Sequence, residues 1–568
     1  MALRGFPASR PARGGPRRWL TPGGHRHRPL GRVLALAAGS VVIVPLLAAS
    51  ASQGSTAQAG SAQAQDSSSR LSVNWALSGQ ASATSSGSNA PAANAIDGDA
   101  GTDWCPDSWT GSLVVDLGRV RSLDDLGITL DAASPSANAS IDIASQPGAW
   151  QPVPAAKNIA LDPGNPMYVP LPRSTQARFA RLTVYSGTGA PVCVGELRAF
   201  GPDPAAAGMA LGADLSFTPQ ELAAGAQFTD RGRPASPVTI MRDHGASYVR
   251  MRLWVNPPPG YSNLASDLAL ARSVRAAGMR IYLDIMYSDF WADPQHQDIP
   301  AAWQGQDLGQ LTATVRAYTQ QAIAAFAKQG TPVDMVAIGN EIRNGMLWPV
   351  GQVNPTTGAG YDALATLLTA GVAGARAGNP PGHQLLVMMH YDQGGNNQLS
   401  QAFYQNLVSR NVPFDVIGLS YYPFFHGTIS QMRANVDALA TQFHKKIMIA
   451  ETQYAWTLAN GDSTGDFVWQ TSQVSTGYPA SPGGQLSFLS DELSILAQVP
   501  DGLGAGLFYW APEWIPGVGW EPGAGTPNDN LTLFNFQGTA LPSIGLFENP
   551  ATVCASYDPY DVPCVIGG

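Results

Sequence analysis

The stretch Val333-Asp-Met-Val-Ala-Ile-Gly-Asn-Glu341 combines a short apolar run with a polar end. Residues 335–338 continue the hydrophobic run of a parallel strand covered on both faces, and such strands occur almost only in α/β folds. Asn340 and Glu341 follow at the C-terminal end of this strand, where (β/α)8 barrels assemble their functional groups. Glu341 is therefore a candidate for chemistry rather than for solubility.

A second stretch, Lys446-Ile-Met-Ile-Ala-Glu451, is again an apolar run that ends in a glutamate. Two carboxylates at the ends of two barrel strands are the minimum for cleaving a glycosidic bond: one protonates the leaving oxygen and the other attacks or activates water. A lone glutamate at the end of a strand is more often a solvated loop residue or a helix cap than a catalytic group. Their convergence on one barrel mouth would favour catalysis, and we predict a glycoside hydrolase that uses Glu341 and Glu451.

The composition limits the class of protein. At 568 residues the chain is longer than one ordinary domain, so we expect at least two globular units. Only 13% of the residues are charged, and the net charge of −9 argues against a nucleic-acid partner, which needs basic patches.

The N-terminal region resembles a targeting segment. Eight arginines between Arg4 and Arg32 precede an apolar run over residues 33–49, as in the n-region and h-region of a secretory signal. We predict a signal peptide over residues 1–51, with an uncleaved membrane anchor as the alternative, and then a disordered linker over 52–70. The mature protein is expected to be secreted and extracellular, with no membrane partner after cleavage.

The four cysteines are then interpreted as two disulfides formed in an oxidising compartment. Cys105 and Cys193 bracket the first ordered region and are expected to pair, although their positions alone do not prove it. Cys554 and Cys564 are expected to close a small loop near the end of the chain.

Residues 71–201 contain short β runs punctuated by Gly, Pro, Asn and Ser, with no apolar run of helical length between them. They predict an all-β jelly-roll sandwich. A Pro- and Ala-rich linker over residues 202–208 would let this domain fold as a separate unit.

Residues 209–568 alternate short apolar runs with amphipathic helices, which indicates a parallel sheet. Eight such runs predict a (β/α)8 barrel with enlarged loops. A doubly wound open sheet is the alternative, but no Gly-rich phosphate fingerprint follows any of the runs. The eight runs are residues 209–214, 248–253, 279–285, 333–338, 384–389, 414–419, 446–450 and 504–510.

Polar and aromatic residues are concentrated where these runs end. They include arginines that could keep a nucleophile ionised, an amide that could hold a sugar hydroxyl, and a tryptophan whose flat face could support a sugar ring. A lone histidine in such a set is more often a satisfied core group than a ligand. The set is Arg250, Arg252, Tyr287, Asp289, Asn340, His390, Tyr421, Tyr422 and Trp510, besides the two glutamates.

Several longer motifs in this part of the chain resemble the family 53 endo-β-1,4-galactanases. They are Gly212-Ala-Asp-Leu-Ser216, Tyr248-Val-Arg-Met-Arg-Leu-Trp254, Tyr287-Ser-Asp-Phe-Trp-Ala-Asp-Pro294, Pro300-Ala-Ala-Trp303, Gly339-Asn-Glu-Ile-Arg-Asn-Gly-Met-Leu-Trp-Pro349, Ser420-Tyr-Tyr-Pro423, Glu451-Thr-Gln-Tyr454 and Gly506-Leu-Phe-Tyr-Trp510. The resemblance implies a retaining clan A mechanism with Glu341 as acid/base and Glu451 as nucleophile, about 5 to 5.5 Å apart.

The resemblance also implies a set of substrate contacts and no catalytic cofactor. The substrate would be the β-1,4-galactan side chains of pectin, in galactan or type I arabinogalactan, and we expect a monomeric enzyme. The implied contacts are Arg252, Tyr287, Asp289, Trp291, Asn340, Trp348, His390, Tyr421 and Trp510.

Two positions depart from the family pattern. Met286 stands where the family has a histidine at the catalytic centre, and we expect it to face the barrel interior together with Asp284. Ala511 replaces a glutamate that usually follows the last strand, and a glutamate occurs instead at Glu513. Bacterial relatives often hold a calcium ion after the seventh strand, and Asp462 and Asp466 could serve there or could be solvated turn residues.

The first domain resembles the discoidin or coagulation factor type C jelly roll used by carbohydrate-binding modules. The motifs are Asn94-Ala-Ile-Asp-Gly-Asp-Ala-Gly-Thr-Asp-Trp104, Leu113-Val-Val-Asp-Leu-Gly118, Arg178-Phe-Ala-Arg-Leu-Thr183 and Gly195-Glu-Leu-Arg-Ala-Phe-Gly201. The resemblance implies a structural calcium on Asp97, Thr102 and Glu196, although Asp97-Gly98 could be only a turn. Candidate sugar contacts in this domain are Trp75, Trp109 and Trp150.

Two other functions remain open at this point. Another clan A endo-β-glycanase, such as a mannanase or a cellulase, would share Asn340, Glu341 and Glu451. A non-catalytic sugar-binding protein on a barrel scaffold is suggested by Met286 and Ala511, but it would not need both glutamates.

Overall fold

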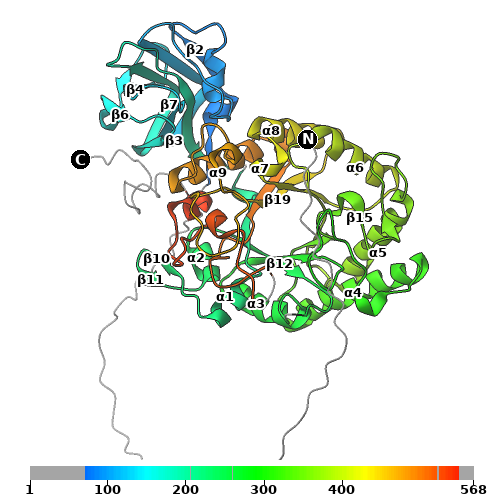
Figure 1. The fold of residues 1–568 in the computed structure, drawn as a ribbon. Coiled ribbons are helices and arrows are strands. Elements are labelled where there is room, and N and C mark those ends of the chain that lie inside the picture. Colours follow the sequence, from blue (N-terminus) through cyan, green and yellow to red (C-terminus); the bar gives the residue numbers. More distant parts are fainter. Residues whose placement is uncertain (1–70, 205, 259, 521–522, 549–568) are drawn as a thin grey trace, which may run out of the picture. The chain divides into compact units, whose positions relative to one another are not determined.

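A computed structural model describes residues 71–548 apart from 205, 259, 521 and 522 (Figure 1). These residues form an antiparallel β domain followed by a closed parallel barrel with helices around it. The predicted signal peptide (1–51), the predicted linker (52–70) and the predicted pair Cys554 and Cys564 lie outside the described residues.

The β domain is one sheet in the order β1-β8-β3-β7-β4-β5, with β2 paired to β3 and β6 paired to β4. The strands β3 and β7 bend and shift register, so each pairs with different neighbours along its length. Alternate residues of β3, such as Leu113 and Val115, are buried, as expected for a sheet with one face in the core. The strands are β1 Ser72–Asn74, β2 Gln80–Ala83, β3 Thr110–Leu130, β4 Ala137–Ala144, β5 Gln151–Pro152, β6 Ile159–Leu161, β7 Pro166–Tyr185 and β8 Val194–Pro202.

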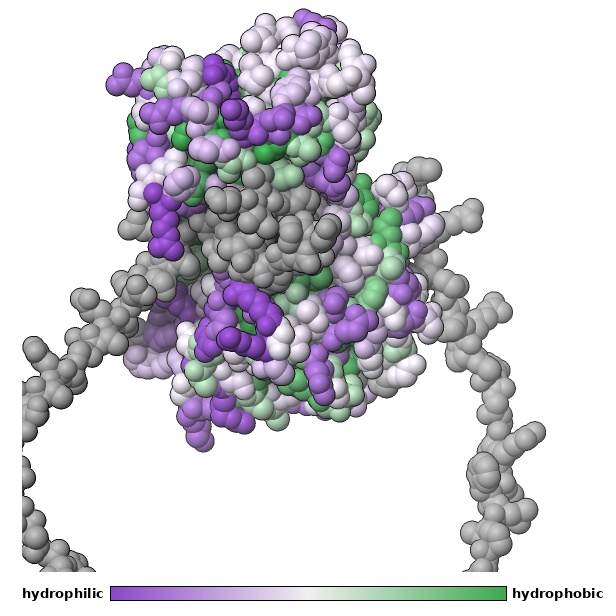
Figure 2. Space-filling model, turned by 90° about the vertical axis from the view of Figure 1, so that its left-hand side faces the viewer, coloured by the Kyte–Doolittle hydropathy of each residue, from purple (hydrophilic) through white to green (hydrophobic). Residues whose placement is uncertain are grey.

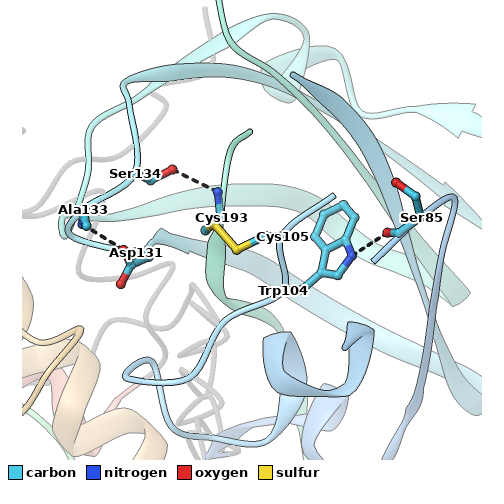
Figure 3. Close-up of a disulfide and its surroundings, with 7 residues drawn as sticks. All are labelled: Ser85, Trp104, Cys105, Asp131, Ala133, Ser134 and Cys193. Atoms are coloured by element: carbon cyan, nitrogen blue, oxygen red, sulfur yellow. Dashed lines mark hydrogen bonds between the residues drawn. A yellow bond between two sulfur atoms is a disulfide. The ribbon is translucent and has the colours of Figure 1, made fainter. Parts of the chain in front are cut away.

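The structure contains the disulfide predicted between Cys105 and Cys193 (Figure 3). It joins the loop before β3 to the residue that precedes β8, across 88 positions of sequence. The backbone amide of Cys193 donates to Oγ of Ser134 at 2.9 Å, and the indole of Trp104 donates to the carbonyl of Ser85 at 2.9 Å. The disulfide therefore lies in a loop region that hydrogen bonds also hold.

The second part confirms the predicted (β/α)8 barrel. Eight strands close in the order β12-β13-β14-β17-β18-β19-β20-β9, and every neighbouring pair is parallel. All C-terminal strand ends therefore meet at one mouth. The strands are β9 Ala210–Asp214, β12 Tyr248–Leu253, β13 Arg280–Ile285, β14 Met335–Ile338, β17 Leu386–Tyr391, β18 Val416–Tyr421, β19 Lys446–Thr452 and β20 Gly504–Tyr509.

Side chains fill the interior of the barrel. Tyr282, Met388 and Phe508 lie in a buried cluster there, and Tyr282 donates its hydroxyl hydrogen to Sδ of Met388 at 3.3 Å. Gly418 is required beside them, because a Cβ at this position would lie 2.2 Å from Sδ of Met388. This packing supports the mouth from below.

Several of the surrounding helices begin at side chains that cap their first turn. Asn263, Asp307 and Thr428 cap three of them with reciprocal side-chain bonds to the first turn. The helices are α1 Thr218–Ala224, α2 Pro237–Asp243, α3 Leu264–Ala276, α4 Leu308–Gln329, α5 Tyr361–Gly378, α6 Asn397–Ser409, α7 Pro423–His426, α8 Ile429–Phe443 and α9 Pro482–Ala497. Two short hairpins complete the fold, β10 Thr229–Asp230 with β11 Arg233–Pro234 and β15 Gly345–Met346 with β16 Gly351–Gln352.

A buried ion pair joins the β domain to the barrel. Nη2 of Arg198 on β8 lies 2.5 Å from Oδ2 of Asp491 on α9, and neither side chain is exposed. Tyr478 donates its hydroxyl hydrogen to the same Oδ2 at 2.8 Å. Removing one partner from a buried pair leaves an uncompensated charge, so the barrel without the β domain would hold Asp491 at a large cost in stability.

The loop that contains Asp97 also contacts barrel helices. Arg433 on α8 donates to the backbone carbonyl of Asp97 at 2.8 Å, and Ser430 donates to Oδ2 of Asp99 at 2.5 Å. The amide of Ala100 donates to the hydroxyl of Tyr478 at 3.1 Å. Polar contacts from both domains therefore hold this loop.

Hydrophilic and hydrophobic residues are interspersed over the face of the protein in Figure 2, as suits a chain with few charged residues. Within residues 71–548, leaving aside the four that are not described, none of the helices has both the length and the apolar character needed to span a membrane.

Candidate active site

One guanidinium connects the strands at the barrel mouth. Arg250 on β12 donates from Nη1 to Oδ2 of Asp214 at 2.6 Å and from Nη2 to Oδ2 of Asp284 at 2.9 Å. The same Nη2 lies 2.9 Å from Oδ1 of Asn340 and 2.6 Å from Oε1 of Glu451. The Arg250 side chain is fully buried, and these contacts replace water at both of its terminal nitrogens, whereas Nε has no hydrogen-bond partner among the described residues. They bring together groups from β9, β13, β19 and the loop after β14.

Glu451 has a hydrogen-bond donor on each carboxylate oxygen. Arg250 contacts Oε1, and the hydroxyl of Tyr422 donates to Oε2 at 2.7 Å. Burial raises the pKa of Glu451, while the charge of Arg250 and the hydrogen bond from Tyr422 oppose that rise. These two donors favour the ionised carboxylate, which is the form that a nucleophile needs.

Glu341 lies in a different electrostatic environment. Ser420 donates its hydroxyl hydrogen to Oε1 of Glu341 at 2.6 Å, and no cation of the described residues is recorded in contact with this carboxyl group. Burial raises the pKa of Glu341 well above its usual range, and the negative charges of Glu451 and Asp392 raise it further. The pKa of Glu341 is thus raised more strongly than that of Glu451, which makes Glu341 the better proton donor of the two and Glu451 the better nucleophile.

The two carboxyl groups lie close together. One oxygen of Glu341, one oxygen of Glu451 and one ring nitrogen of His390 all lie within 4.8 Å of one another. Two neighbouring carboxyls whose pKa values are raised to different extents can act as a proton donor and a nucleophile on the same bond.

Three residues directly beyond barrel strands adopt left-handed backbone conformations without being glycine. They are Tyr287 after β13 with φ 51°, Glu341 after β14 with φ 47°, and Ala511 after β20 with φ 44°. Such conformations cost about 1–2 kcal/mol each in an L-residue and concentrate at functional sites. At Glu341 the sharp turn follows Gly339, which also has positive φ at 85°.

Aromatic rings line one side of the same mouth. Trp510 meets Trp291 edge-on at 6.3 Å and Tyr422 edge-on at 6.5 Å between ring centroids. Trp291 in turn stacks on Trp520 at 4.3 Å. These rings offer flat apolar faces of the kind that sugar rings pack on. Trp348 is half-buried, and its indole donates to the carbonyl of Asn344 at 2.8 Å.

Of the predicted substrate contacts, the structure brings Asn340, Trp291 and Trp510 to the mouth, whereas His390 is fully buried beside the two glutamates. Asn340 accepts from Arg250 and donates from Nδ2 to the carbonyl of Ala292 at 2.8 Å, so its position is well defined.

Arg252 does not reach the carboxylate pair. Its guanidinium is buried between Phe217 at 4.0 Å and Trp291 at 4.3 Å from the ring centroids, and burial lowers its pKa to about 10. The role expected for an arginine beside the nucleophile is taken by Arg250, two positions earlier on the same strand.

Two predicted tyrosines point away from the mouth. The hydroxyl of Tyr287 is 2.6 Å from Oγ1 of Thr319 on α4, and the hydroxyl of Tyr421 donates to the carbonyl of Gly427 at 3.1 Å. Both side chains lie in the layer between the strands and the helices. Because side chains alternate along a strand, Tyr422 and not Tyr421 faces the substrate side.

Asp289 connects two loops rather than facing the carboxylate pair. Its Oδ1 accepts from the amide of Asn256 at 3.0 Å and its Oδ2 accepts from the amide of Ala301 at 2.8 Å. Asp214 and Ser420 contribute to the site but were not predicted as contacts. Asp214 is the last residue of β9 and Ser420 the second-last of β18, so position near a strand end was the available signal. Position alone does not say which of the residues near a strand end turn inward.

The two departures from the family pattern have defined surroundings. Met286 is buried beside Trp254, whose indole donates to Sδ at 3.0 Å, whereas Asp284 faces Arg250 as expected. Glu513 is fully buried, and Thr218 on α1 donates to its Oε1 at 3.0 Å. Burial raises the pKa of Glu513 to about 8.

The proposed calcium residues of the β domain form an oxygen-only group. Oγ1 of Thr102 lies 2.8 Å from Oδ2 of Asp97 and 3.2 Å from the carbonyl of Asn94. Glu196 is fully buried, its Oε1 accepts only a 3.3 Å bond from the amide of Gly98, and its Oε2 has no hydrogen-bond partner. A buried unpartnered carboxylate oxygen beside other oxygens fits a calcium ligand set.

The second candidate calcium loop has similar features. Both carboxylate oxygens of Asp466 are buried without a hydrogen-bond partner. Burial, together with the charges of Asp529 and Asp462, raises the pKa of Asp466 to about 7. However, Asp462, Asp466 and Asp529 are not among the described groups whose ligand atoms all lie within 4.8 Å of one another, so these three aspartates do not form a ready ion site.

The tryptophans proposed as sugar contacts of the β domain differ in exposure. Trp75 is buried with Arg121 over its ring, Trp109 is 50% exposed, and Trp150 carries Arg181 over its ring at 4.4 Å.

Comparison with known proteins agrees with this geometry. The profile described as "Glycosyl hydrolase family 53" matches residues 210–547. The chain belongs to glycosyl hydrolase family 53. The profile described as "F5/8 type C domain" matches residues 80–196, and the chain is thus a glycoside hydrolase preceded by a discoidin-type domain.

Its relatives match over the barrel. A Neosartorya fischeri protein named "Probable arabinogalactan endo-beta-1,4-galactanase A" is 36% identical over 312 residues, which is 54% of this chain and 84% of the relative. The "Arabinogalactan endo-beta-1,4-galactanase A" of Aspergillus niger is 32% identical over 345 residues, 60% of this chain and 94% of the relative. The solved "Ignisphaera aggregans GH53 catalytic domain" superimposes with a TM-score of 0.57 at 33% identity, covering 61% of this chain and 96% of that one.

The hydrogen bond from Tyr422 to Glu451 gives a prediction with a matched control. A nucleophile must be ionised, so activity persists above the pKa of Glu451 and is lost as the pH falls through it. Tyr422→Phe removes a donor that lowers this pKa, and the acid limb of kcat/KM should move up by about one pH unit with at least about a tenfold loss of rate.

Tyr421→Phe is the control, because its hydroxyl bonds to Gly427 and not to the site. It should leave the acid limb where it is in the wild type. Equal shifts in the two variants, measured by pH–rate profiles, would mean that the hydroxyl of Tyr422 does not act on Glu451.

Proposed function

We propose that this protein is a secreted endo-β-1,4-galactanase that cleaves galactan or type I arabinogalactan, the side chains of pectin, with retention of configuration. The observation that carries the mechanism is the pair Glu341 and Glu451, whose oxygens lie within 4.8 Å of each other and whose surroundings raise the pKa of Glu341 more strongly than that of Glu451. The galactan specificity is supported by membership of family 53 and by the names of its relatives.

In the first step, the ionised Glu451 attacks the anomeric carbon of a bound galactosyl unit. The bond from that carbon to the glycosidic oxygen breaks, and Glu341 gives its proton to the departing oxygen. Arg250 and Tyr422 hold the attacking carboxylate in place until it forms the ester. The product is a glycosyl-enzyme and a shortened chain with a free hydroxyl.

In the second step, Glu341 is ionised and accepts a proton from water. The water oxygen bonds to the anomeric carbon, and the carbon–oxygen bond to Glu451 breaks, which restores both carboxyl groups. A short separation of the two carboxyls supports this double displacement, because a single displacement needs room for water between them.

The remaining features support a polysaccharide substrate and an extracellular location. The aromatic wall of Trp291, Trp510 and Tyr422 can support sugar rings beside the nucleophile. The Cys105–Cys193 disulfide is typical of oxidising compartments. We infer that the discoidin-type domain acts as a carbohydrate-binding module.

Digestion of polysaccharides tests the substrate. The enzyme should release short oligosaccharides from linear β-1,4-galactan at least about tenfold faster than from mannan or a soluble cellulose, because a site that pairs with one set of hydroxyls leaves buried groups unpaired with another. Glu341→Gln and Glu451→Gln should each lower the galactan rate by at least about 10²- to 10⁴-fold.

Glu221→Gln is the matched control. Glu221 is a buried glutamate on α1 whose pKa burial raises to about 9, so it is protonated at neutral pH and resembles glutamine. This variant should retain its galactan activity. Faster turnover of mannan or cellulose than of galactan by the wild type would refute the proposed specificity.

We also propose a structural calcium on Asp97, Thr102 and Glu196, where it would supply positive charge to the buried Glu196 carboxylate. Removal with a chelator should lower the melting temperature by about 5 °C, and added calcium should restore it. Asp97→Asn should abolish the change in melting temperature on removal of calcium. Asp466→Asn should abolish this change only if the bound calcium lies in the barrel loop that contains Asp462 and Asp466. An unchanged melting temperature would contradict the proposal.

A further inference from the structure

A chain of two hydrogen bonds leads from a buried histidine to Glu341. Nε2 of His390 lies 2.9 Å from Oγ of Ser420, and that hydroxyl lies 2.6 Å from Oε1 of Glu341. His390 lies on β17, Ser420 lies on β18, and Glu341 follows β14. His390 and Ser420 are both fully buried, so neither is free to contact a sugar directly.

The surroundings of His390 determine which groups donate and which accept in these two hydrogen bonds. Burial lowers the pKa of His390 well below its usual range, and the charge of Arg250 lowers it further, so the ring is neutral with one proton. Nδ1 is buried and has no hydrogen-bond partner among the described residues. A proton on Nδ1 would be a buried unsatisfied donor, whereas a proton on Nε2 donates to Ser420.

With Nε2 as donor, the hydroxyl of Ser420 accepts from His390 and gives its own hydrogen to Glu341. Each group in the chain then has one defined role, and Oε1 of Glu341 is held as an acceptor. A carboxyl group whose one oxygen already accepts a strong hydrogen bond carries its proton on the other oxygen.

We propose that Ser420 and His390 are positioning residues for the acid/base: they hold Oε1 of Glu341 and leave Oε2 to carry the proton that passes to the glycosidic oxygen. This inference rests on the proposed function for its second half, the transfer to a glycosidic oxygen. The positioning itself does not depend on which polysaccharide is cleaved.

The hydrogen bond from Ser420 also opposes the other influences on the pKa of Glu341. Burial and the surrounding carboxylates favour the protonated form, while the hydrogen bond from Ser420 favours the ionised form that the second step needs. The titratable and charged groups around Glu341 are Glu451 on β19, Asp392 after β17 with its partner Arg343 at 3.1 Å, Asp293 in the loop after β13, Tyr422 after β18, Arg250 on β12 and His390 itself.

The direction in which the alkaline limb of kcat/KM should move follows from the role of Glu341 as the acid. Glu341 must be protonated for the first step, so kcat/KM is lost as the pH rises through its pKa. Ser420→Ala removes a bond that lowers this pKa and should move the alkaline limb of kcat/KM up by about one pH unit. We expect kcat to fall by about tenfold as well, because the ionised Glu341 that accepts a proton from water loses its donor.

Two pairs of variants separate positioning from simple packing. Ser420→Thr keeps the hydroxyl and should leave the alkaline limb near its wild-type position. His390→Gln keeps a donor of similar reach and should leave the alkaline limb near its wild-type position. His390→Leu removes the donor and should move the alkaline limb in the same direction as Ser420→Ala. Thermal unfolding of each variant shows which of them are folded.

A titration that needs no substrate completes the test. Carboxyl ¹³C NMR of glutamate-labelled enzyme, with Glu341 assigned from Glu341→Gln, should give a higher pKa for Glu341 in Ser420→Ala and in His390→Leu than in the wild type. If Ser420→Ala does not fold, the comparison of His390→Gln with His390→Leu decides by the same signal.

The outcomes distinguish this inference from the proposed function. Galactan hydrolysis by the wild type with an unchanged Glu341 titration in both donor-lacking variants would overturn the positioning role and leave the function standing. A shifted titration in an enzyme that cleaves another β-glycan would support the positioning role and refute the galactanase assignment.

Discussion

The site depends on one buried positive charge. Arg250 contacts Asp214, Asp284, Asn340 and Glu451, which come from β9, β13, the loop after β14, and β19. A buried guanidinium is tolerated only when it is paired, so the barrel strands that supply its partners are tied to one another through it. One arginine cannot neutralise three carboxylates, and burial raises the pKa of Asp284 to about 7. Within the catalytic pair, Arg250 contacts Glu451, with its Nη2 2.6 Å from Oε1 of that glutamate.

The difference between the two glutamates follows from this placement. Glu451 receives Arg250 and Tyr422, whereas Glu341 receives one hydroxyl and faces other carboxylates. The same residue type thus acquires two protonation preferences from its surroundings, which is how carboxyl pairs divide acid and nucleophile roles. The left-handed backbone at Glu341 costs conformational free energy, which the packing of the barrel below it offsets.

The sequence predicted the barrel because apolar runs of strand length alternate with amphipathic helices, and it predicted the two glutamates because each ends such a run. It could not decide between neighbours on one strand. Arg250 and Arg252 share a strand and a residue type, yet the first reaches the carboxylates and the second lies among aromatic rings. Tyr421 and Tyr422 differ by one position, and the alternation of side chains along the chain decides which of them faces the mouth. The contacts of Arg198 with Asp491 join segments far apart in the sequence, and no local pattern indicates them.

The central claim is that Glu451 attacks the sugar directly while Glu341 supplies and then recovers the proton. The anomeric form of the first product tests it most directly. A soluble β-1,4-galacto-oligosaccharide can be digested in an NMR tube and its anomeric protons followed before mutarotation. The account predicts that the β-anomer appears first and the α-anomer only later. An α-anomer formed first would contradict it, because inversion requires water between carboxyls about 6.5–9.5 Å apart.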